Sequence, residues 1–215
     1  MAWSPDGKAL ASSGEEGAVK LWSAEGKELQ ELKGFKEHVR DFSWTPDSKR
    51  LAMASWLEGT ITIREAATGA LDRGLVDHSA NLLGLAFTPK GDLVSCAGSV
   101  AKLWALPERT QERRYNAGKN NAKVLAVSPD GAWLVTAGVD GALRVWSLGS
   151  GLLVETLRGH ARPVLSLAFR PDSGRSLGLG LGAQGPHPSL LVGPLLRQGR
   201  AQLEPRRIKG PDRRA

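Results

Sequence analysis

The stretch VSPDGAWLVTAGVDGALRVWSLGSGLLVETLRGH occupies residues 127–160 and contains one complete period of the pattern that decides the fold. A Pro-Asp-Gly turn at Pro129 follows one apolar run, and an Asp-Gly turn at 140–141 follows the next. A third run, LRVW, ends at Trp146, and a fourth, LLVETL, fills residues 152–157. Pro and Gly interrupt every helical window, and Gly permits the positive φ of a tight hairpin turn. The stretch therefore predicts short β-strands joined by turns.

The same pattern recurs along the chain. The proline of the turn returns every 40 to 43 residues, at Pro5, Pro46, Pro89, Pro129 and Pro171. The last residue of the third run returns every 40 to 42 residues, at Trp22, Arg64, Trp104 and Trp146. Two independent landmarks in phase indicate a structural repeat, and each repeat is expected to supply four antiparallel strands.

On these landmarks, residues 1–174 resemble the WD40-repeat family, in which a period of about 40 to 45 residues forms one four-stranded propeller blade. The resemblance implies an all-β fold. It would be a partial WD40-type β-propeller of about four blades plus an incomplete fifth, with an irregular C-terminal tail. In the family, a Gly-His precedes the first strand of each blade, a Ser or Thr lies in the second, an Asp in the next turn and a Trp in the third. These side chains form hydrogen bonds within the blade.

The family's polar set is incomplete in this sequence. Eleven residues before the turn prolines stand Phe35, His78, Gly118 and His160, so the histidine is present twice. Six residues before the third-strand positions stand Glu16, Glu58, Gly98 and Asp140, so the aspartate is present once. The resemblance implies structural roles for His78, His160, Thr136, Asp140, Trp22, Trp104 and Trp146. Because an incomplete buried network loses hydrogen-bond compensation, we expect apolar packing to stabilise the blades.

Both ends of the repeat region depart from the pattern. Trp3 falls in the register at which the first strands of later repeats end, so we expect the first blade to lack its inner strand. The fifth repeat loses the pattern soon after Asp172, and residues 176–215 contain seven Gly and five Pro. The predicted organisation is therefore WD40-type blades over 1–174 and a disordered Gly/Pro/Arg-rich tail over 175–215.

Incomplete ends leave strand edges unpaired, and unpaired edges invite association with another chain. Propellers of the family most often close with seven blades. Two interpretations stay open: the chain is a fragment of a larger propeller, or it closes by associating with itself.

The net charge of +7 belongs to the tail. Residues 1–169 contain 20 basic and 19 acidic side chains, whereas residues 170–215 contain 9 and 3. The tail includes the basic cluster Arg206, Arg207, Lys209, Arg213 and Arg214. Such a cluster can contact phosphates, but no aromatic residue follows Phe169 to stack on single-stranded bases. We expect a solvated tail and no nucleic-acid partner; a nucleic-acid-associated protein that uses this tail is the alternative.

The composition also predicts the compartment. No apolar stretch approaches the roughly 18 residues of a membrane-spanning helix, and the first residues, MAWSPDGK, lack the pattern of a signal peptide. Cys96 is the single cysteine, so the chain forms no internal disulfide. We expect a cytoplasmic protein with no membrane contact.

The sequence predicts no catalytic, metal or cofactor site. The segment GLGAQG at 180–185 matches a dinucleotide-binding fingerprint, but Pro186 follows it directly and no strand and helix flank it. The four histidines show no metal-ligand spacing. The sequence contains the residue types of a hydrolase triad, at His78, His160, Ser95, Thr136 and Asp140. The family uses those positions for bonds within a blade, and nothing supplies an oxyanion hole.

Three residues are candidate partner contacts. Trp56 lies in a turn between a second and a third strand that is one residue longer than in the first repeat, and Trp133 replaces the Ala9 or Arg50 of sister repeats. Exposed tryptophans are enriched at interfaces, although packing between blades is an equal alternative. Arg64 replaces a tryptophan and would bind a partner carboxylate; alternatively, its aliphatic stem covers the blade.

These observations favour a non-catalytic protein-protein interaction scaffold of the WD40-repeat type that requires no cofactor. Its partners would be proteins or peptides. Besides the nucleic-acid alternative, the resemblance permits a regulatory propeller module split from a kinase- or NTPase-containing chain. An enzyme built on the propeller ranks last, because it would need polar groups converging in the channel.

Overall fold

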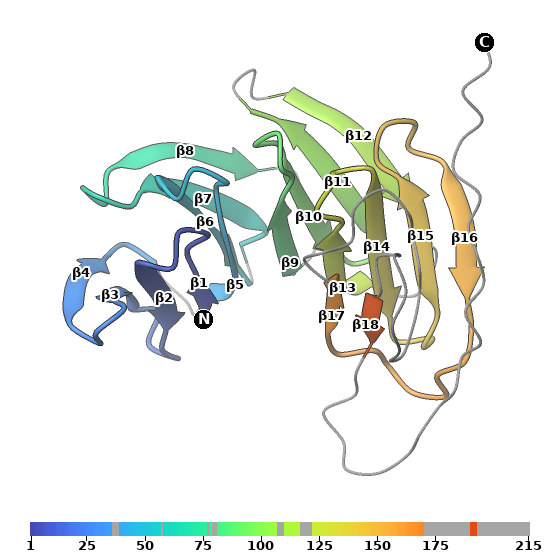
Figure 1. The fold of residues 1–215 in the computed structure, drawn as a ribbon, viewed down its shortest axis with the longest axis horizontal. Helices are drawn as coiled ribbons and strands as arrows, with labels where there is room; N and C mark the ends of the chain where they lie inside the picture. The colour runs from blue at the N-terminus through green and yellow to red at the C-terminus, as the bar shows by residue number, and fades with distance from the viewer. Residues whose placement is uncertain are drawn as a thin grey trace. The chain divides into compact units, whose positions relative to one another are not determined.

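The computed structural model describes residues 1–35, 39–56, 58–76, 78, 81–106, 110–116, 122–169 and 190–192. Every regular element in these ranges is a β-strand, and four of the five sheets are four-stranded and antiparallel (Figure 1). The all-β prediction of four blades with an incomplete fifth is thereby confirmed. The chain forms two compact units, Met1–Lys123 and Val124–Ala215.

The first unit contains three sheets whose strands follow one another in chain order. The first sheet consists of β1 (Ala2–Trp3), β2 (Ala9–Ser13), β3 (Val19–Ser23) and β4 (Glu28–Leu32). The second consists of β5 (Val39–Trp44), β6 (Arg50–Ser55), β7 (Thr60–Glu65) and β8 (Leu71–Val76). The third consists of β9 (Leu82–Phe87), β10 (Leu93–Ala97), β11 (Val100–Ala105) and β12 (Thr110–Asn116).

The fourth sheet consists of β13 (Ala122–Val127), β14 (Trp133–Gly138), β15 (Leu143–Ser147) and β16 (Leu153–Leu157), and the boundary of the second unit falls inside β13. A two-stranded fifth sheet pairs β17 (Leu167–Phe169) with β18 (Leu190–Val192). At the start of the chain, the inner strand is reduced to the two residues of β1. Apart from β18, the predicted tail lies outside the described residues.

The proline turns are built on a buried hydroxyl group that the sequence reasoning missed. The residue before each of the first four prolines is buried: Ser4, Thr45, Thr88 and Ser128. In the fourth repeat, Ser128 Oγ lies 2.5 Å from Asp130 Oδ1 and accepts the N–H of Trp133 at 2.9 Å. The hydroxyl thus joins the two strands, because it satisfies a donor at the start of the next strand.

The acidic-Gly turns are also confirmed. Gly17, Gly59 and Gly141 have φ values of 82°, 62° and 68°, in the left-handed region that disfavours any residue with a Cβ. At Gly141, a Cβ would also collide with the carbonyl oxygen of His160. The glycine therefore allows the chain leaving β16 to lie directly against this turn.

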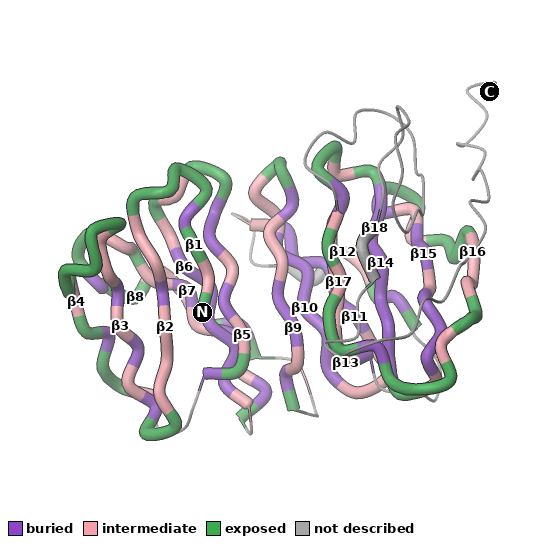
Figure 2. Tube along the Cα trace, turned by 60° about the horizontal axis from the view of Figure 1, so that its bottom comes forward, coloured by how far each residue is buried: buried purple, intermediate pink, exposed green. Residues whose placement is uncertain are grey.

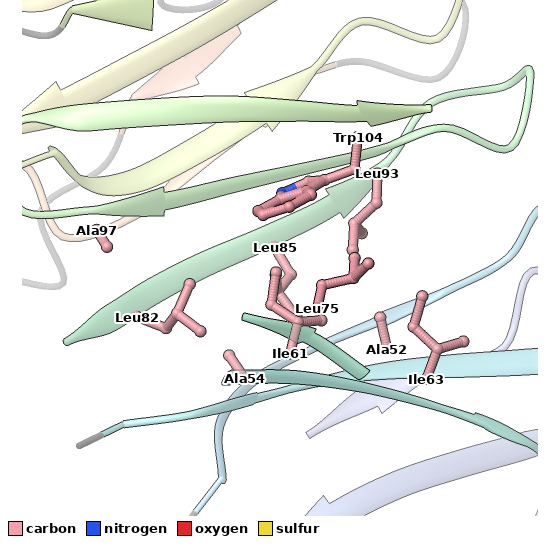
Figure 3. Close-up of a cluster of buried hydrophobic side chains, with 10 residues drawn as sticks. All are labelled: Ala52, Ala54, Ile61, Ile63, Leu75, Leu82, Leu85, Leu93, Ala97 and Trp104. Carbon is pink, nitrogen blue, oxygen red and sulfur yellow. The ribbon is translucent and has the colours of Figure 1, made fainter. Parts of the chain in front are cut away.

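The core lies in the middle strands of each sheet. All residues of β10 and β14 are buried, and so are all but the first of β6 and β11 (Figure 2). Between the second and third sheets, apolar side chains of both sheets form one cluster (Figure 3): Ala52, Ala54, Ile61, Ile63, Leu75, Leu82, Leu85, Leu93, Ala97 and Trp104. Because these strands are covered on both faces, they carry apolar residues at successive positions instead of alternating ones.

Candidate functional site

Four of the predicted site residues lie at one end of their sheets, which we call the turn end. In an antiparallel meander, successive connections alternate between two ends, so the turn from the second to the third strand and the connection to the next sheet share an end. Trp56 lies in the β6–β7 turn and His78 between β8 and β9. Asp140 lies in the β14–β15 turn and His160 between β16 and β17.

In the third sheet, a histidine, a serine and a tryptophan share one hydroxyl oxygen. Trp104 donates its Nε1–H to Ser95 Oγ at 2.8 Å, and His78 Nε2 lies 2.7 Å from the same oxygen. The rings of His78 and Trp104 meet edge to face with their centroids 6.0 Å apart. The imidazole therefore ties the β8–β9 connection to the two middle strands.

The fourth sheet keeps the tryptophan bond and lacks the histidine. Trp146 donates Nε1–H to Thr136 Oγ1 at 3.0 Å. Gly118 stands at the histidine position of this repeat. The Asp140 carboxylate instead accepts the Arg144 Nη2–H at 2.6 Å, in an ion pair whose side chains are 15% and 13% exposed. The aspartate is thus paired inside its own hairpin.

The first sheet repeats the tryptophan bond with a residue that was not predicted. Trp22 donates Nε1–H to Ser12 Oγ at 2.8 Å. Ser12 stands ten residues before Trp22, as Thr136 stands ten before Trp146, so the spacing alone was a sufficient signal. Among the described residues, no imidazole bonds to Ser12.

His160 occupies the histidine position of the fifth repeat, but its ring nitrogen Nε2 is buried without a hydrogen-bond partner. Buried polar atoms are rarely left unpaired, and each exception calls for an explanation. The two predicted repeat histidines therefore differ: one completes its sheet and the other lacks a partner.

Trp56 is half-buried in the β6–β7 turn, and the Arg40 guanidinium lies over its ring, 5.9 Å from the centroid. Val76, at the end of β8, pairs with Thr60 at the start of β7 and is 72% exposed. All three lie at the turn end of the second sheet, with Arg40 near the start of β5 and Val76 at the end of β8, and we call Arg40, Trp56 and Val76 the turn-end patch. It combines an aromatic ring, an exposed cation and an exposed aliphatic side chain in one sheet.

Trp133 requires a correction. Its side chain is only 8% exposed and packs in a cluster with Val135, Val145 and Val164, against which Phe169 also packs. Those contacts span the fourth sheet and the β17 segment, so Trp133 lies between successive repeats. A side chain covered in this way has no surface for a partner, and the alternative reading of packing between blades describes it.

Arg64 has donors engaged within the chain. Its Nη1–H bonds to the carbonyl of Gly69 at 3.1 Å and its Nη2–H to the carbonyl of Lys33 at 3.0 Å. Its guanidinium also lies 5.3 Å from the centroid of the Phe35 ring. The arginine thus links the second sheet to the segment leaving the first. A contact with a partner carboxylate stays an untested prediction.

Asp41 is an unpredicted buried carboxylate on the inner strand β5. It accepts the N–H of Phe42 at 2.9 Å and, on its other oxygen, the N–H of Leu85 on β9 at 2.7 Å. Burial raises the pKa of this carboxyl above its ordinary value, although both backbone bonds lower it. Burial, with a smaller contribution from the Asp41 charge, also raises the pKa of the Cys96 thiol. Asp41 therefore links the inner strands of two successive sheets.

Several other predictions concern residues outside the described ranges, among them the basic cluster, the GLGAQG segment and two of the four histidines, His38 and His187. Within the described ranges, His, Cys, Asp and Glu side chains form no group of three that could hold a metal ion. The same ranges contain no helix long and apolar enough to span a membrane.

Comparisons with known proteins agree with this geometry. The family model described as "WD domain, G-beta repeat" matches residues 1–23 and 111–147. Apoptotic protease-activating factor 1 of Rattus norvegicus is 29% identical over 80% of this chain. An uncharacterized WD repeat-containing protein of Synechocystis is 33% identical over 67% of this chain. The guanine nucleotide-binding protein subunit beta-5b of Danio rerio is 24% identical over 68%.

The chain spans only part of these relatives: 14% of the rat protein, 42% of the Synechocystis protein and 39% of the zebrafish protein. The matched repeats include the sheets in which Trp22 and Trp146 each donate to a hydroxyl group on the preceding strand. Since the period, the sheets and the relatives agree, the chain belongs to the WD40-repeat family.

Proposed function

We propose that this chain is a non-catalytic interaction scaffold that binds protein or peptide partners through the turn-end patch of its second sheet. The observation that carries the proposal is Trp56, a half-buried indole that lies in a turn and not in a strand, beneath the Arg40 guanidinium. Tryptophan and arginine are the residue types that most often dominate binding energy at interfaces. The WD40-repeat relatives support the general scaffold role.

The chemistry of the patch indicates what a partner would carry. Val76 and the Trp56 ring offer apolar surface, and Arg40 is an exposed cation that favours a carboxylate. A peptide with an apolar anchor beside an acidic residue would complement both. We therefore expect the partners to be polar peptides with a short apolar segment. Such peptides would bind on the surface of the turns and not inside a closed pocket.

The polar residues that resemble catalytic groups support a non-catalytic role. The Ser95 hydroxyl already accepts the indole N–H of Trp104 and lies against His78, so its oxygen is held in the sheet. The Asp140 carboxylate is held by Arg144. A nucleophile must be free to reach a reacting atom beside oxyanion donors, and these groups are fixed by their neighbours.

Selection of a displayed peptide library on the immobilised full chain tests the proposal. Peptides selected on the wild-type chain are expected to bind Trp56→Ala and Val76→Ala at least tenfold more weakly, the range of an interface hot spot. Leu71→Ala is the matched control, because Leu71 is an exposed aliphatic residue on the same strand, β8, at the opposite end. If Leu71→Ala weakens binding as much, or no peptide is selected, the proposal is wrong.

The cytoplasmic location and the two alternatives, a nucleic-acid-associated protein using the basic tail and a module split from a kinase- or NTPase-containing chain, stay predictions. Each concerns residues outside the described ranges or the cell that contains the protein. None is needed for the turn-end patch to bind a partner.

A further inference from the structure

The second sheet ends in a strand, β8, whose outer edge is open. Its strands lie in the order β5-β6-β7-β8, and among the described residues no further strand pairs with β8 (Figure 1). An unpaired edge presents backbone N–H and C=O groups that another extended chain can use. Because β8 ends at Val76, a member of the turn-end patch, the open edge and the patch are continuous.

The hydrogen bonds at the end of β7 show how its backbone groups alternate between its two neighbours. The N–H of Ala66, directly after β7, bonds to the Lys49 carbonyl on the β6 side at 2.8 Å. The N–H of Glu65 bonds to the Ala70 carbonyl on the β8 side at 3.0 Å. Successive residues of an antiparallel strand continue this alternation. Even-numbered residues of β7 therefore bond toward β6, and odd-numbered residues bond toward β8.

This alternation identifies the backbone groups of β8 that face outward. Thr60 and Thr62 are even-numbered residues of β7, so their N–H and C=O groups bond toward β6. In the pairing register, Val76 stands opposite Thr60, and Gly74 stands opposite Thr62. Residues opposite such positions receive no bonds from β7. The N–H and C=O groups of Gly74 and Val76 therefore point to the open edge.

The charged side chains of β8 do not protect this edge. Exposed charges commonly keep other chains away from an edge strand, and β4, the outer strand of the first sheet, carries Glu28 and Glu31 in exposed positions. On β8, the Arg73 Nε–H instead donates to Asp72 Oδ2 at 2.7 Å, and the two side chains are only 10% and 22% exposed. The rest of the strand, residues 74–76, is uncharged.

The face of the sheet beside the outward groups is bare. Leu75 is buried in the cluster between the second and third sheets, so positions 74 and 76 point to the other face. A Cβ at Gly74 would meet no atom within 4 Å, and Val76 is 72% exposed. Glycine inside a strand often marks a place where another backbone approaches closely. The end of β8 therefore has room for a further strand and its side chains.

We propose that an extended segment of a protein partner pairs with β8 and becomes a fifth strand of the second sheet. Gly74 and Val76 exchange hydrogen bonds with the segment, which continues over the turn end. There an apolar side chain meets Val76 and Trp56, and an acidic side chain meets the exposed cation of Arg40. In this mode main-chain bonds supply affinity, and alternate side chains supply specificity. The inference rests on the proposed function and adds to it the conformation in which the partner binds.

Amide hydrogen exchange of the full chain, with and without a peptide selected on it, is the first test. Without peptide, the amides of Gly74 and Val76 should exchange faster than those of Arg73 and Leu75, which bond to β7. Saturating peptide should slow exchange at Gly74 and Val76 at least tenfold. Unchanged exchange at both would overturn the proposal. Protection that rises with chain concentration in the absence of peptide would mean that a second copy occupies the edge, and would also overturn it.

A scan of the peptide by single N-methylation is the second test, and it leaves the chain itself unchanged. Only alternate residues of an added strand bond to the edge of the sheet. Methylation of those amides should weaken binding about tenfold, the effect of one lost hydrogen bond, and methylation of the intervening amides should have little effect. A scan without this period of two residues would contradict pairing with β8.

Gly74→Pro is the third test, because it removes one outward N–H, a change that edge strands tolerate. It should weaken peptide binding at least tenfold. Leu153→Pro is the matched control on the outer strand of the fourth sheet. The Ser147 N–H bonds to the Leu152 carbonyl, so the backbone of Leu153 also faces outward, at an edge distant in sequence from the patch. This control should leave binding unchanged.

The three tests separate the added strand from the proposed function. If Trp56→Ala weakens binding but a folded Gly74→Pro chain binds like the wild type, the patch stands and the added strand is wrong. If Gly74→Pro and the N-methylation scan give the expected losses but Trp56→Ala has no effect, the added strand stands and the patch is wrong. Should Gly74→Pro fail to fold, hydrogen exchange and the N-methylation scan decide on the unchanged chain.

Discussion

At Ser95, one hydroxyl oxygen serves two side chains at once. It accepts the Trp104 indole N–H and lies 2.7 Å from the His78 nitrogen, and the residue is fully buried. Ser12, in the first sheet, serves only Trp22 and is half-buried. Serine at the same strand position thus takes part in different numbers of hydrogen bonds in the two sheets. The stability effects of substituting the two serines can therefore be compared directly.

Ser95→Ala is expected to lower the free energy of unfolding by about 2–3 kcal/mol, because two buried groups lose their partner. Ser12→Ala should cost about 1 kcal/mol, because one half-buried indole N–H loses its partner. Urea unfolding monitored by tryptophan fluorescence measures both. Equal losses at the two sites would contradict the assignment of His78 to the Ser95 set.

Asp41 gives a pH-dependent prediction. Since burial raises its pKa in the folded chain, the folded state binds a proton more readily than the unfolded state does. Stability from this group is therefore greatest below the ordinary pKa of an aspartate and is lost as the pH rises through the raised value. Relative to Asp41→Asn, the wild-type chain should gain stability as the pH falls from 7 toward 4.

Parallel unfolding curves of the two chains across this pH range measure that difference. The comparison with Asp41→Asn cancels the contribution of other carboxyls, such as Asp47, whose pKa is lowered by its hydrogen bond to Thr45 and whose protonation destabilises the fold in acid. A constant difference between the two chains would show that the Asp41 carboxyl titrates normally.

The strands follow from the repeat, and departures from it occur at single positions both in turns, such as Trp56, and in strands, such as Arg64 and Trp133. The period in the sequence predicts four strands in each repeat because turn residues and apolar runs recur in phase. Side-chain partners are less predictable. The bond of Asp41 to Leu85 joins residues 44 apart, and only the packing of one sheet on the next brings them together. Trp133 looks exceptional in sequence, yet neighbouring apolar residues cover it.

The proline turn of the second repeat contains a serine in a strained backbone conformation. Ser48 has a φ of 60°, where the equivalent Gly7, Gly91 and Gly131 have 71°, 91° and 69°. A non-glycine residue in this region costs about 1 kcal/mol or more. Its hydroxyl also accepts the Asp6 N–H at 3.1 Å across two sheets, in an exposed position. The backbone strain at Ser48 therefore lowers the stability of the fold, whereas the hydrogen bond to Asp6 raises it.

Ser48→Gly should raise the free energy of unfolding by about 0.5 kcal/mol, because relief of strain exceeds the loss of one exposed bond. Ser48→Ala is the control, since it removes the bond and keeps the strain, and it should be destabilising. Thermal unfolding of both variants decides the sign. A destabilised glycine variant would mean that the link to Asp6 matters more than the backbone conformation.

For the molecule as a whole, the sequence is sufficient to predict the fold class, the number of four-stranded sheets and the family. The sequence is insufficient to predict which residues contact a partner, because the candidates were chosen only by their departure from the repeat. Departure alone does not distinguish a residue that faces solvent, such as Val76, from one that fills a gap between repeats, such as Trp133. Burial depends on neighbours that the pattern does not specify.

The buried hydroxyls of the proline turns have a consequence for modification. Ser4-Pro5, Thr45-Pro46, Thr88-Pro89 and Ser128-Pro129 each read as a site for proline-directed phosphorylation. The four hydroxyl residues are only 2% to 5% exposed, and the charge that a phosphate group adds is costly to bury. A kinase can therefore reach these hydroxyl groups only before the sheets fold or after they unfold. A phosphate at any of them would indicate a blade that is not folded.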